Sequence, residues 1–582
     1  MGVLHSGPHA LREYAVVADG ERAVLLGPDG DCAWMCFPSW DSPAAFDALV
    51  GGSGGYWVRP ETEWRVWGGH YEERSLIWRS RWIAGDHGGV VVECREALAR
   101  PASPDRAVLL RRVTAVEGPA RVRVDLDVRT AFGAHTMDDL RESDGVWHAR
   151  SGDVHIRWTG AGESKPEGER LTLVIDLKHG ESHDLVLELA GREQTGPLNA
   201  SELWAATETA WLKSVPACDD TIAPREAQLA YAVLTGLTAS TGAMVAAATT
   251  SLPERAEAGR NYDYRYAWIR DQCYAGQAVA AHGGCLDLLD SAVGFISERI
   301  AADGHRLRPV YTATGARVPE ERAVDLPGYP GADRVVVGNR ASEQFQLDVF
   351  GEVLLLFAAA QRAGRLGGTA AQAARTAVEA IAERRNEPEA GVWETEDRQW
   401  THSRLICVAG LRAAGDTIAT AAERLEWHRL ANTILAEATR TSLRPSGGWR
   451  RAPDDDRTDA ALLLAGIRGA LPPHDPRVTA TLRSVRESLV REGFVYRYRI
   501  GDRPLGEAEG AFSLAGFLLA LAERQQGRTT EALRCFERIR SACGTSGLFT
   551  EEYDVEQRQL RANLPQAFVH ALLLESATRL AR

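Results

Sequence analysis

The pattern of apolar residues changes once along this chain, near residues 215–224, and this change limits the possible folds more than any other feature. Before it, apolar and polar residues alternate, as they do over residues 121–129. This period of two is typical of a strand with one buried and one solvated face. After it, apolar residues recur at helical spacing up to the end of the chain. A chain of 582 residues exceeds what one hydrophobic core usually supports, so we expect a β-domain followed by a helical domain.

The first part predicts a large antiparallel β-sandwich over residues 1–214. Alternating runs recur at 154–158, 171–177 and 184–189, and turn signals rich in glycine and proline separate others. A polar, proline-bounded linker is expected at 215–225, and the helical domain at 226–582. Candidate helices lie near 225–240, 271–282, 285–301, 341–364, 369–385, 401–415, 418–441, 458–468, 475–491, 511–525, 529–541 and 565–580.

Twelve helices suggest six helical hairpins, which form either an open solenoid or a closed barrel. A solenoid requires self-similarity at a fixed period, and none is visible. The helices are instead joined by long, unequal loops at 302–340, 386–400, 492–510 and 544–564. Because loops of that length in a compact domain are usually functional, the sequence favours a closed barrel with a pocket built from loops at one end.

Composition excludes several classes of partner. The net charge is −13 and no lysine- or arginine-rich block occurs, which argues against nucleic acid or an anionic membrane. The nine cysteines form no CxxC pair and no zinc-like spacing, so we expect reduced core residues and no metal site. No secretion signal and no run of roughly 18 apolar residues is present, so we expect a cytoplasmic protein acting on a small, neutral substrate.

Residues 261–271 are the first candidate for a binding site. This stretch holds four aromatic residues, two arginines and two aspartates in eleven positions. Aromatic faces stack on sugar rings, and charged groups hold sugar hydroxyls through strong hydrogen bonds. The alternative is that the aromatic residues are core and that Arg270-Asp271 is a surface pair.

Two loops carry carboxylates beside aromatic residues. Glu394 follows a tryptophan directly, and Glu551-Glu552 precede a tyrosine just before the last candidate helix. Glycosidic hydrolysis requires one carboxylic acid that protonates the leaving oxygen and one carboxylate that activates water. The alternatives are a solvated loop residue at position 394 and an acidic pair favoured by the helix dipole at 551–552.

Six ordered motifs, spread over nearly the whole chain, resemble those of a bacterial member of glycoside hydrolase family 15, which includes glucoamylases, glucodextranases and trehalase-like enzymes. They lie at residues 14–43, 261–271, 337–352, 391–394, 495–512 and 551–570. The resemblance implies an N-terminal β-sandwich and a catalytic (α/α)6 barrel. It also implies that Glu394 is the general acid and Glu551 the general base of an inverting mechanism that needs no cofactor.

The same resemblance implies a set of substrate-binding residues: Tyr264, Trp268, Arg270, Asp271, Gln346, Asp348, Trp393, Arg497 and Glu552. Arg270 and Asp271 would hold hydroxyls of the first glucose, and the tyrosine and tryptophans would form its walls. The loop after Glu394 departs from the family pattern because it continues as Thr-Glu-Asp, so the preferred linkage stays open. Glu509 lies in an equally suitable motif and is a second candidate for the base.

We therefore expect an inverting, exo-acting α-glucosidase that releases β-glucose from short isomalto- or malto-oligosaccharides. An α,α-trehalase is the nearest alternative. A catalytically silent sugar-binding protein would not need both Glu394 and Glu551. A phosphorylase would need donors for an anion where Glu551 stands, and two acids there would repel phosphate.

Overall fold

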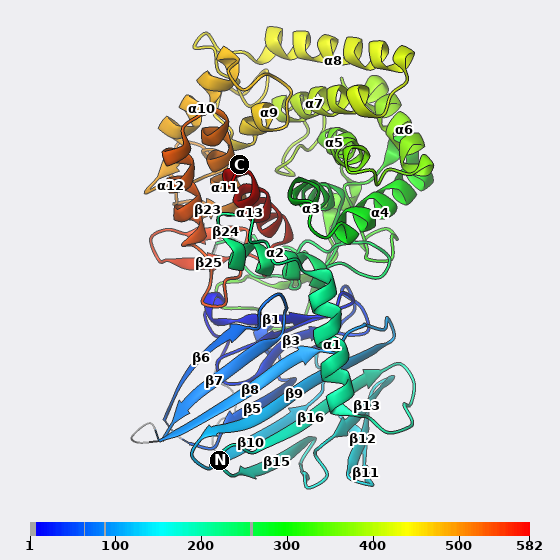
Figure 1. The fold of residues 1–582 in the computed structure, drawn as a ribbon, viewed down its shortest axis with the longest axis vertical. Helices are drawn as coiled ribbons and strands as arrows, with labels where there is room; N and C mark the ends of the chain where they lie inside the picture. Colours follow the sequence, from blue (N-terminus) through cyan, green and yellow to red (C-terminus); the bar gives the residue numbers. More distant parts are fainter. Residues whose placement is uncertain (1–6, 63, 86–88, 256–259) are drawn as a thin grey trace.

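The computed structural model describes residues 7–62, 64–85, 89–255 and 260–582, and it has two tiers (Figure 1). The N-terminal tier consists of antiparallel sheets. The outer sheet has the order β11-β12-β13-β16-β9-β8-β7-β6, and two further sheets have the orders β14-β15-β10-β5 and β1-β2-β3-β4. Their strands are β1 (Ala15–Ala18), β2 (Ala23–Leu26), β3 (Cys32–Cys36), β4 (Ala44–Phe46), β5 (Gly55–Pro60), β6 (Arg65–Tyr71), β7 (Trp78–Ala84), β8 (Val90–Leu98), β9 (Arg106–Glu117), β10 (Ala120–Asp127), β11 (Asp138–Ser143), β12 (Val146–Ser151), β13 (Val154–Thr159), β14 (Lys165–Glu167), β15 (Arg170–Leu177) and β16 (Ser182–Ala190).

The predicted alternation on β10 holds along the whole apolar face but only along the first half of the polar face, where Arg121 is exposed. Val122, Val124 and Leu126 are fully buried in the core between the sheets. On the opposite face Asp125 and Asp127 are also buried, although the pattern predicts a solvated face. Neighbouring arginines and a threonine hydrogen-bond these carboxylates, which offsets the cost of burying them.

Helices form the second tier, and their bounds follow the predicted ones in most cases. They are α2 (Pro224–Gly236), α3 (Ile269–His282), α4 (Asp287–Asp303), α5 (Asp348–Arg362), α6 (Gly368–Arg384), α7 (Thr401–Thr417), α8 (Ala421–Ser442), the 3₁₀ turn η5 (Ala460–Leu463) with α9 (Leu464–Ile467), α10 (Pro476–Ser488), α11 (Ser513–Gln525), α12 (Thr529–Arg540) and α13 (Ala567–Leu580). Helix α1 (Ala200–Ser214) was not predicted; it runs along the sandwich toward the barrel (Figure 1).

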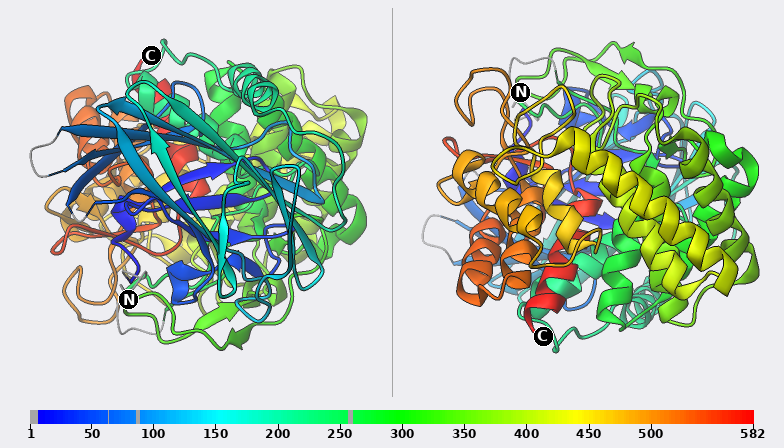
Figure 2. Two further views of the ribbon diagram at one scale, coloured as in Figure 1. Left: turned by 90° about the horizontal axis from the view of Figure 1, so that it is seen from below. Right: turned by 90° about the horizontal axis from the view of Figure 1, so that it is seen from above.

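The helices close into an (α/α)6 barrel. Six helical segments pack against one another in a ring: α3, α5, α7, η5 with α9, α11 and α13. The ring closes where α13 packs on α3. The helices outside the ring are α2, α4, α6, α8, α10 and α12 (Figure 1). The view from above shows α8, in yellow, lying across the side of the barrel that faces away from the sandwich (Figure 2). α5 and α13 are buried on nearly every face, which is typical of inner helices, whereas α8 buries a single stripe. Within the described residues, no helix is both long and apolar enough to cross a bilayer.

Two helices differ from their predictions. The predicted helix at 341–364 begins only at Asp348, because the 3₁₀ turn η4 (Arg340–Glu343) and an extended segment precede it. The predicted helix at 458–468 is present at 460–467, but its first turn is the 3₁₀ turn η5 and only α9 is α-helical. Gly469 and Pro472-Pro473 prevent the helix from continuing further. The domain boundaries at 214 and 225 stay predictions.

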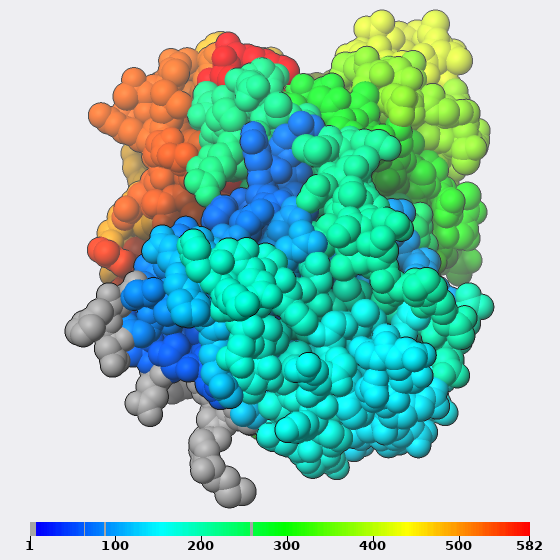
Figure 3. Space-filling view, turned by 60° about the horizontal axis from the view of Figure 1, so that its bottom comes forward, coloured from blue at the N-terminus to red at the C-terminus, as the bar shows by residue number. Residues whose placement is uncertain are grey.

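Arg265 joins the two tiers. Its side chain is fully buried and forms a two-point ion pair with Asp263 at 2.7 and 2.9 Å. Its third nitrogen reaches the sandwich loop after β3, where it donates to the carbonyl oxygens of Ser42 at 2.8 Å and Trp40 at 3.3 Å. The space-filling view shows the two tiers packed against each other along this boundary (Figure 3). Two charged residues of the stretch 261–271, Asp263 and Arg265, therefore serve the domain interface rather than a pocket.

A hairpin from the barrel also contacts the sandwich. It consists of β19 (Arg322–Val324) and β20 (Val335–Val337). At its tip Gly328 donates to the carbonyl of Val50 at 2.9 Å, and the Tyr329 hydroxyl donates to the carbonyl of His9 at 2.8 Å. Short two- and three-stranded ladders cover the same end of the barrel: β17 (Ala267–Trp268) with β18 (Val310–Tyr311), β21 (Val490–Arg491) with β22 (Phe494–Val495), and β23 (Ala511–Phe512) with β24 (Glu552–Asp554) and β25 (Gln559–Arg561).

Candidate active site

A cavity of about 460 Å³ opens at the end of the barrel where inner helices begin. Trp268, Phe512 and Gln566 line it, and each immediately precedes the first residue of an inner helix, α3, α11 or α13. Helix N-termini carry partial positive charge and unpaired N–H groups, so this end suits a ligand rich in oxygen atoms. The lining residues are Ala246, Glu254, Arg260, Tyr262, Tyr264, Trp268, Arg270, Asp271, Tyr274, Glu321, Arg334, Asn339, Arg340, Ala341, Gln344, Val392, Trp393, Glu394, Thr395, Arg497, Tyr498, Phe512, Leu514, Glu551, Gln566 and Phe568.

Glu394 lies on a tight turn in the cavity wall. The turn is closed by hydrogen bonds from Glu394 N–H to the Gly391 carbonyl at 3.1 Å and from Thr395 N–H to the Ala390 carbonyl at 3.0 Å. The backbone of Glu394 has a φ of 53°, in the left-handed region that a non-glycine residue rarely adopts. Such strain persists only where the surroundings impose it and is frequent at functional sites.

One oxygen of Glu394 receives all the hydrogen bonds to this carboxyl group. Its Oε1 accepts from Trp268 Nε1 at 2.7 Å and from Arg270 and Gln346 at 3.3 Å each. No described side chain donates to its Oε2. The arrangement fixes the orientation of the carboxyl group and leaves Oε2 as the oxygen that can carry a proton toward a ligand.

Glu551 lies in the same cavity just before β24. The Tyr264 hydroxyl donates to its Oε2 at 2.8 Å, and only 7% of the residue is exposed. Burial and the nearby carboxyl group of Glu254 raise the pKa of Glu551 to about 8, against the lowering effect of Arg497 and Tyr264. The rings of Tyr264 and Trp268 meet edge to face with centroids 5.5 Å apart. The two glutamates are therefore held by the two members of one aromatic pair.

Arg270 and Asp271 occupy the floor of the cavity, in the first turn of α3. Arg270 donates to Gln346 at 2.6 Å and to Asp348 at 3.3 Å, and both partners are buried behind it rather than on the cavity surface. Asp271 is not a hydrogen-bond partner of Arg270 in the described structure, and its Oδ2 has no donor there. Burial raises the pKa of Asp271 to about 7, although Arg270 lowers it.

Trp393 and Arg497 form the opposite wall. Trp393 Nε1 donates to both oxygens of Asp459, at 2.9 and 3.0 Å, and its ring meets that of Phe512 at a centroid distance of 5.0 Å. The Arg497 guanidinium lies 5.9 Å from the Trp393 ring centroid, in reach of a cation–π contact.

The other two candidate carboxyl groups lie behind the surface. Glu509 accepts from Arg497 Nε at 2.8 Å, and Glu552 accepts from the backbone N–H of Gly510 at 2.8 Å. Neither is among the residues that line the cavity, whereas Glu551 is. This placement favours Glu551 over Glu509 as the group that meets a water molecule beside a bound ligand.

Several cavity residues were missed by the sequence prediction. Glu254 and Arg260 stand beside Glu551 and Arg497, and Glu321, Arg334 and Arg340 surround the mouth. The segment Leu252-Pro253-Glu254, just before the aromatic stretch, is the only local signal for the first of these. Glu321 precedes β19, and its carboxyl group lies 3.4 Å from each mouth arginine.

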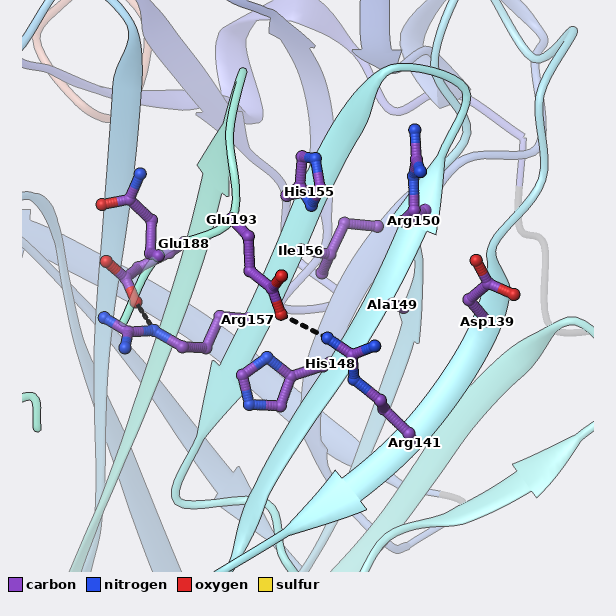
Figure 4. A pocket seen from close by; sticks show the side chains of 11 residues that line it. Asp139, Arg141, His148, Ala149, Arg150, His155, Ile156, Arg157, Glu188 and Glu193 are labelled. Atoms are coloured by element: carbon purple, nitrogen blue, oxygen red, sulfur yellow. Dashed lines mark hydrogen bonds and ion pairs between the residues drawn. The ribbon is translucent and has the colours of Figure 1, made fainter. Parts of the chain in front are cut away.

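A second, smaller cavity of about 140 Å³ lies on the outer sheet (Figure 4). Four of its charged side chains pair with one another: Arg141 with Glu193, and Arg157 with Glu188. It contains no Trp, Tyr or Phe ring and therefore offers no stacking surface for a sugar. Among the described residues, no group of three or more His, Cys, Asp or Glu side chains is arranged to hold a metal ion. All nine cysteines are described, and each is free.

Comparison with known proteins agrees with this geometry. The profile of the family described as glycosyl hydrolases family 15 matches residues 228–578, and that of the trehalase-like N-terminal domain matches residues 5–195. A trehalase from Mycobacterium tuberculosis is 29% identical over 98% of this chain and 90% of its own length. A trehalase from Thermoplasma acidophilum is 25% identical over 96% of this chain and 98% of its own.

The solved structure of a bacterial glucoamylase complexed with acarbose covers all of this chain, and 96% of that structure is covered, with a TM-score of 0.72 and 12% identity. This likeness shows the fold: a β-sandwich joined to an (α/α)6 barrel. The family match extends over most of the barrel and includes both loops that carry the cavity carboxylates. The chain belongs to glycosyl hydrolase family 15 and is a glycoside hydrolase.

Proposed function

We propose that this enzyme hydrolyses α,α-trehalose with inversion of configuration. The observation that carries the proposal is that Glu394 and Glu551 line one cavity and are held there by the Trp268–Tyr264 pair. The choice of trehalose is supported by the trehalase relatives, which align over nearly the whole chain. The cavity volume of about 460 Å³ also lies at the small end of the range for small-molecule sites, roughly 300–1,000 Å³, as suits a disaccharide.

In this mechanism Glu394 is the general acid. Its Oε2 gives a proton to the glycosidic oxygen as the bond from that oxygen to the anomeric carbon breaks. Glu551, as a carboxylate, takes a proton from the water molecule that attacks the anomeric carbon from the opposite face. The attacked ring leaves as β-glucose, and the other ring leaves as α-glucose because its own anomeric bond is untouched. Arg270 and Asp271 hold hydroxyls of the attacked ring from the cavity floor.

A second candidate is the release of β-glucose from the non-reducing end of short malto- or isomalto-oligosaccharides. The mouth of the cavity favours it, because the Arg340 side chain there is 79% exposed and leaves the cavity open to solvent. A longer α-glucoside could extend outward past this side chain. The position of Glu551 disfavours phosphorolysis, because the acids around it would repel a phosphate anion.

Incubation with trehalose, maltose, isomaltose and maltotriose, each with and without phosphate, tests the assignment. We expect the highest kcat/KM with trehalose, and proton NMR of the first turnovers should show equal amounts of α- and β-glucose. Turnover of maltose or isomaltose alone would select the second candidate. Initial release of α-glucose alone would exclude inversion, glucose 1-phosphate would identify a phosphorylase, and binding without turnover would identify a silent sugar-binding protein.

A further inference from the structure

Glu254 is a buried carboxyl group in the cavity wall that the mechanism above does not use. It lies ahead of the aromatic stretch and is 4% exposed. Its Oε2 is 3.5 Å from Arg260 Nη1 and 3.9 Å from Arg497 Nη2, and it has no hydrogen-bond donor among the described residues. A buried carboxylate without hydrogen bonds is costly, so this group has a strong tendency to hold a proton.

The same two arginines face three more carboxyl groups. Glu509 takes the shortest contact, 2.8 Å from Arg497 Nε, and also lies 3.6 Å from Arg260. Glu552 lies 3.9 Å from Arg497. Glu551 is held instead by the Tyr264 hydroxyl, and after burial the charge of Glu254 is the largest influence that raises its pKa, as it is for Glu552. The titratable and charged groups that face this pair are Arg260, Arg497, Glu394, Glu509, Glu552, Asp271, Tyr262 and Tyr264.

Charge balance decides how this cluster titrates. Two guanidinium groups cannot neutralise four carboxylates in a wall with little water, so the cluster retains protons near neutral pH. Glu509 accepts a direct hydrogen bond from Arg497 Nε, whereas Glu254 and Glu551 accept none from an arginine among the described residues. Protons therefore reside on the carboxyl groups with weaker partners, and Glu254 and Glu551 are the two of these that line the cavity.

We propose that Glu254 is a positioning residue that acts through Glu551, the general base. The two carboxyl groups titrate as a unit, and the charge of Glu254 sets the pH above which Glu551 can act as the base. When two carboxyl groups interact this strongly, each apparent pKa describes the pair and not one of the two residues. The inference rests on the proposed role of Glu551. It adds that the acidic limb of the pH profile reports both carboxyl groups.

The test is the pH dependence of kcat/KM on trehalose, or on maltose if trehalose is not turned over. Because a base must be ionised, kcat/KM of the wild type should rise with pH through the pKa of Glu551, near 8. E254Q removes the negative charge that Glu254 acquires as the pair loses its protons, and without that charge the pKa of Glu551 is lower. Its acidic limb should therefore move to lower pH by about one unit, with kcat/KM roughly tenfold above the wild type below the limb.

Glu321→Gln is the matched control, since it removes a carboxyl group from the mouth of the same cavity, away from the cluster. Its acidic limb should stay at the wild-type pH, whatever its KM. Glu254→Asp keeps a carboxyl group, but the shorter side chain places it farther from the cluster. The acidic limb of this variant should therefore also move to lower pH, by less than the limb of E254Q. It also replaces E254Q as the test if the melting temperature shows that E254Q does not fold.

An unmoved limb in folded E254Q, or in E254D if E254Q does not fold, would overturn the proposal. So would a folded E254Q that is inactive at every pH, because Glu254 would then be the base itself. Failure of the underlying assignment is distinguishable: E551Q would remain active at all pH values if Glu551 were not the base. That result does not depend on either variant of Glu254.

Discussion

At the scale of single residues, the two cavity carboxylates carry the sharpest prediction. E394Q and E551Q should each fold with a melting temperature near that of the wild type, since glutamine retains the shape of the side chain. Each should lose about 10²–10⁴-fold in kcat, the usual effect of removing a positioned acid or base. Steady-state kinetics together with thermal unfolding checks both expectations, and near-normal turnover in both variants would remove the assignment.

Glu509→Gln separates the two candidates for the base. Glu509 is buried behind Arg497 and does not line the cavity, so its loss should leave a substantial fraction of kcat. If E509Q is instead as damaging as E394Q while E551Q is mild, the base is Glu509.

Asp271 couples substrate binding to stability. Its pKa is raised to about 7 in the folded protein by burial, above the ordinary value near 3.8. The folded state therefore binds a proton more tightly than the unfolded state, and the stability contributed by protonated Asp271 is lost as pH rises from about 4 to about 7. D271N lacks this loss, so its stability relative to the wild type should increase over that range, by at most about 4 kcal/mol.

The same variant should bind substrate poorly, because an amide cannot accept hydroxyl hydrogen bonds as strongly as a carboxylate. We expect KM to rise tenfold or more. Chemical denaturation at pH 4.5 and pH 8, combined with KM at pH 8, provides the measurement. A D271N enzyme with unchanged KM and a pH-independent stability difference would show that Asp271 has neither role.

At the scale of elements, the turn that carries Glu394 depends on Gly391. Gly391 has a φ of 71°, and a Cβ at this position would lie 2.5 Å from Trp400 Cδ1. G391A should therefore cost more than the roughly 1–2 kcal/mol of a left-handed alanine, and it should lower kcat because the general acid moves. Gly364→Ala is the matched control: its φ is 69°, and nothing lies within 4 Å of the added Cβ.

Thermal unfolding and kcat of both variants decide the point. G364A should lose only the backbone contribution to stability and keep the wild-type kcat. Equal losses in both variants would mean that the turn has no special connection to catalysis.

The barrel helices could be predicted where periodicity alone decides. Helix α3, expected at 271–282, spans Ile269–His282, and α12, expected at 529–541, spans Thr529–Arg540. Prediction failed where tertiary contacts override the pattern. Helix α1 buries only three side chains, including Trp204 and Trp211, and it lies within residues 1–214, for which the sequence predicts a β-sandwich. The predicted helix at 458–468 lies within two residues of its predicted bounds, and only the 3₁₀ geometry of its first turn, η5, is a feature that periodicity does not predict.

The sequence predicts those residues of the site that stand in recognisable local motifs. Trp393-Glu394 and Arg270-Asp271 stand in local motifs, and the structure places all four at one cavity. Glu254 could not be paired with Glu551 from the sequence, because almost 300 residues separate them and only the closed ring of helices brings them together. The positions of Gln346 and Asp348 behind Arg270 likewise depend on packing between α3 and α5.

At the scale of the whole molecule, we expect the contacts of Arg265 to couple the unfolding of the two domains. The wild type should unfold in one cooperative transition. Arg265→Lys keeps the charge opposite Asp263 but loses the hydrogen bonds to the sandwich loop, at a cost of about 3 kcal/mol or more. Calorimetry should then resolve two transitions. Arg121→Lys, at a 59% exposed side chain on β10, should change neither the number nor the temperature of the transitions.

The contacts of Arg265 and of the β19–β20 hairpin have a consequence for how substrate enters. Both fasten the cavity end of the barrel to the sandwich, one through a buried guanidinium and the other through Gly328 and Tyr329. A hinge between the domains would have to break these contacts in every catalytic cycle. Sugar therefore enters and leaves through the open mouth of the cavity, past the exposed Arg340 side chain, while the two domains stay in place as a single frame.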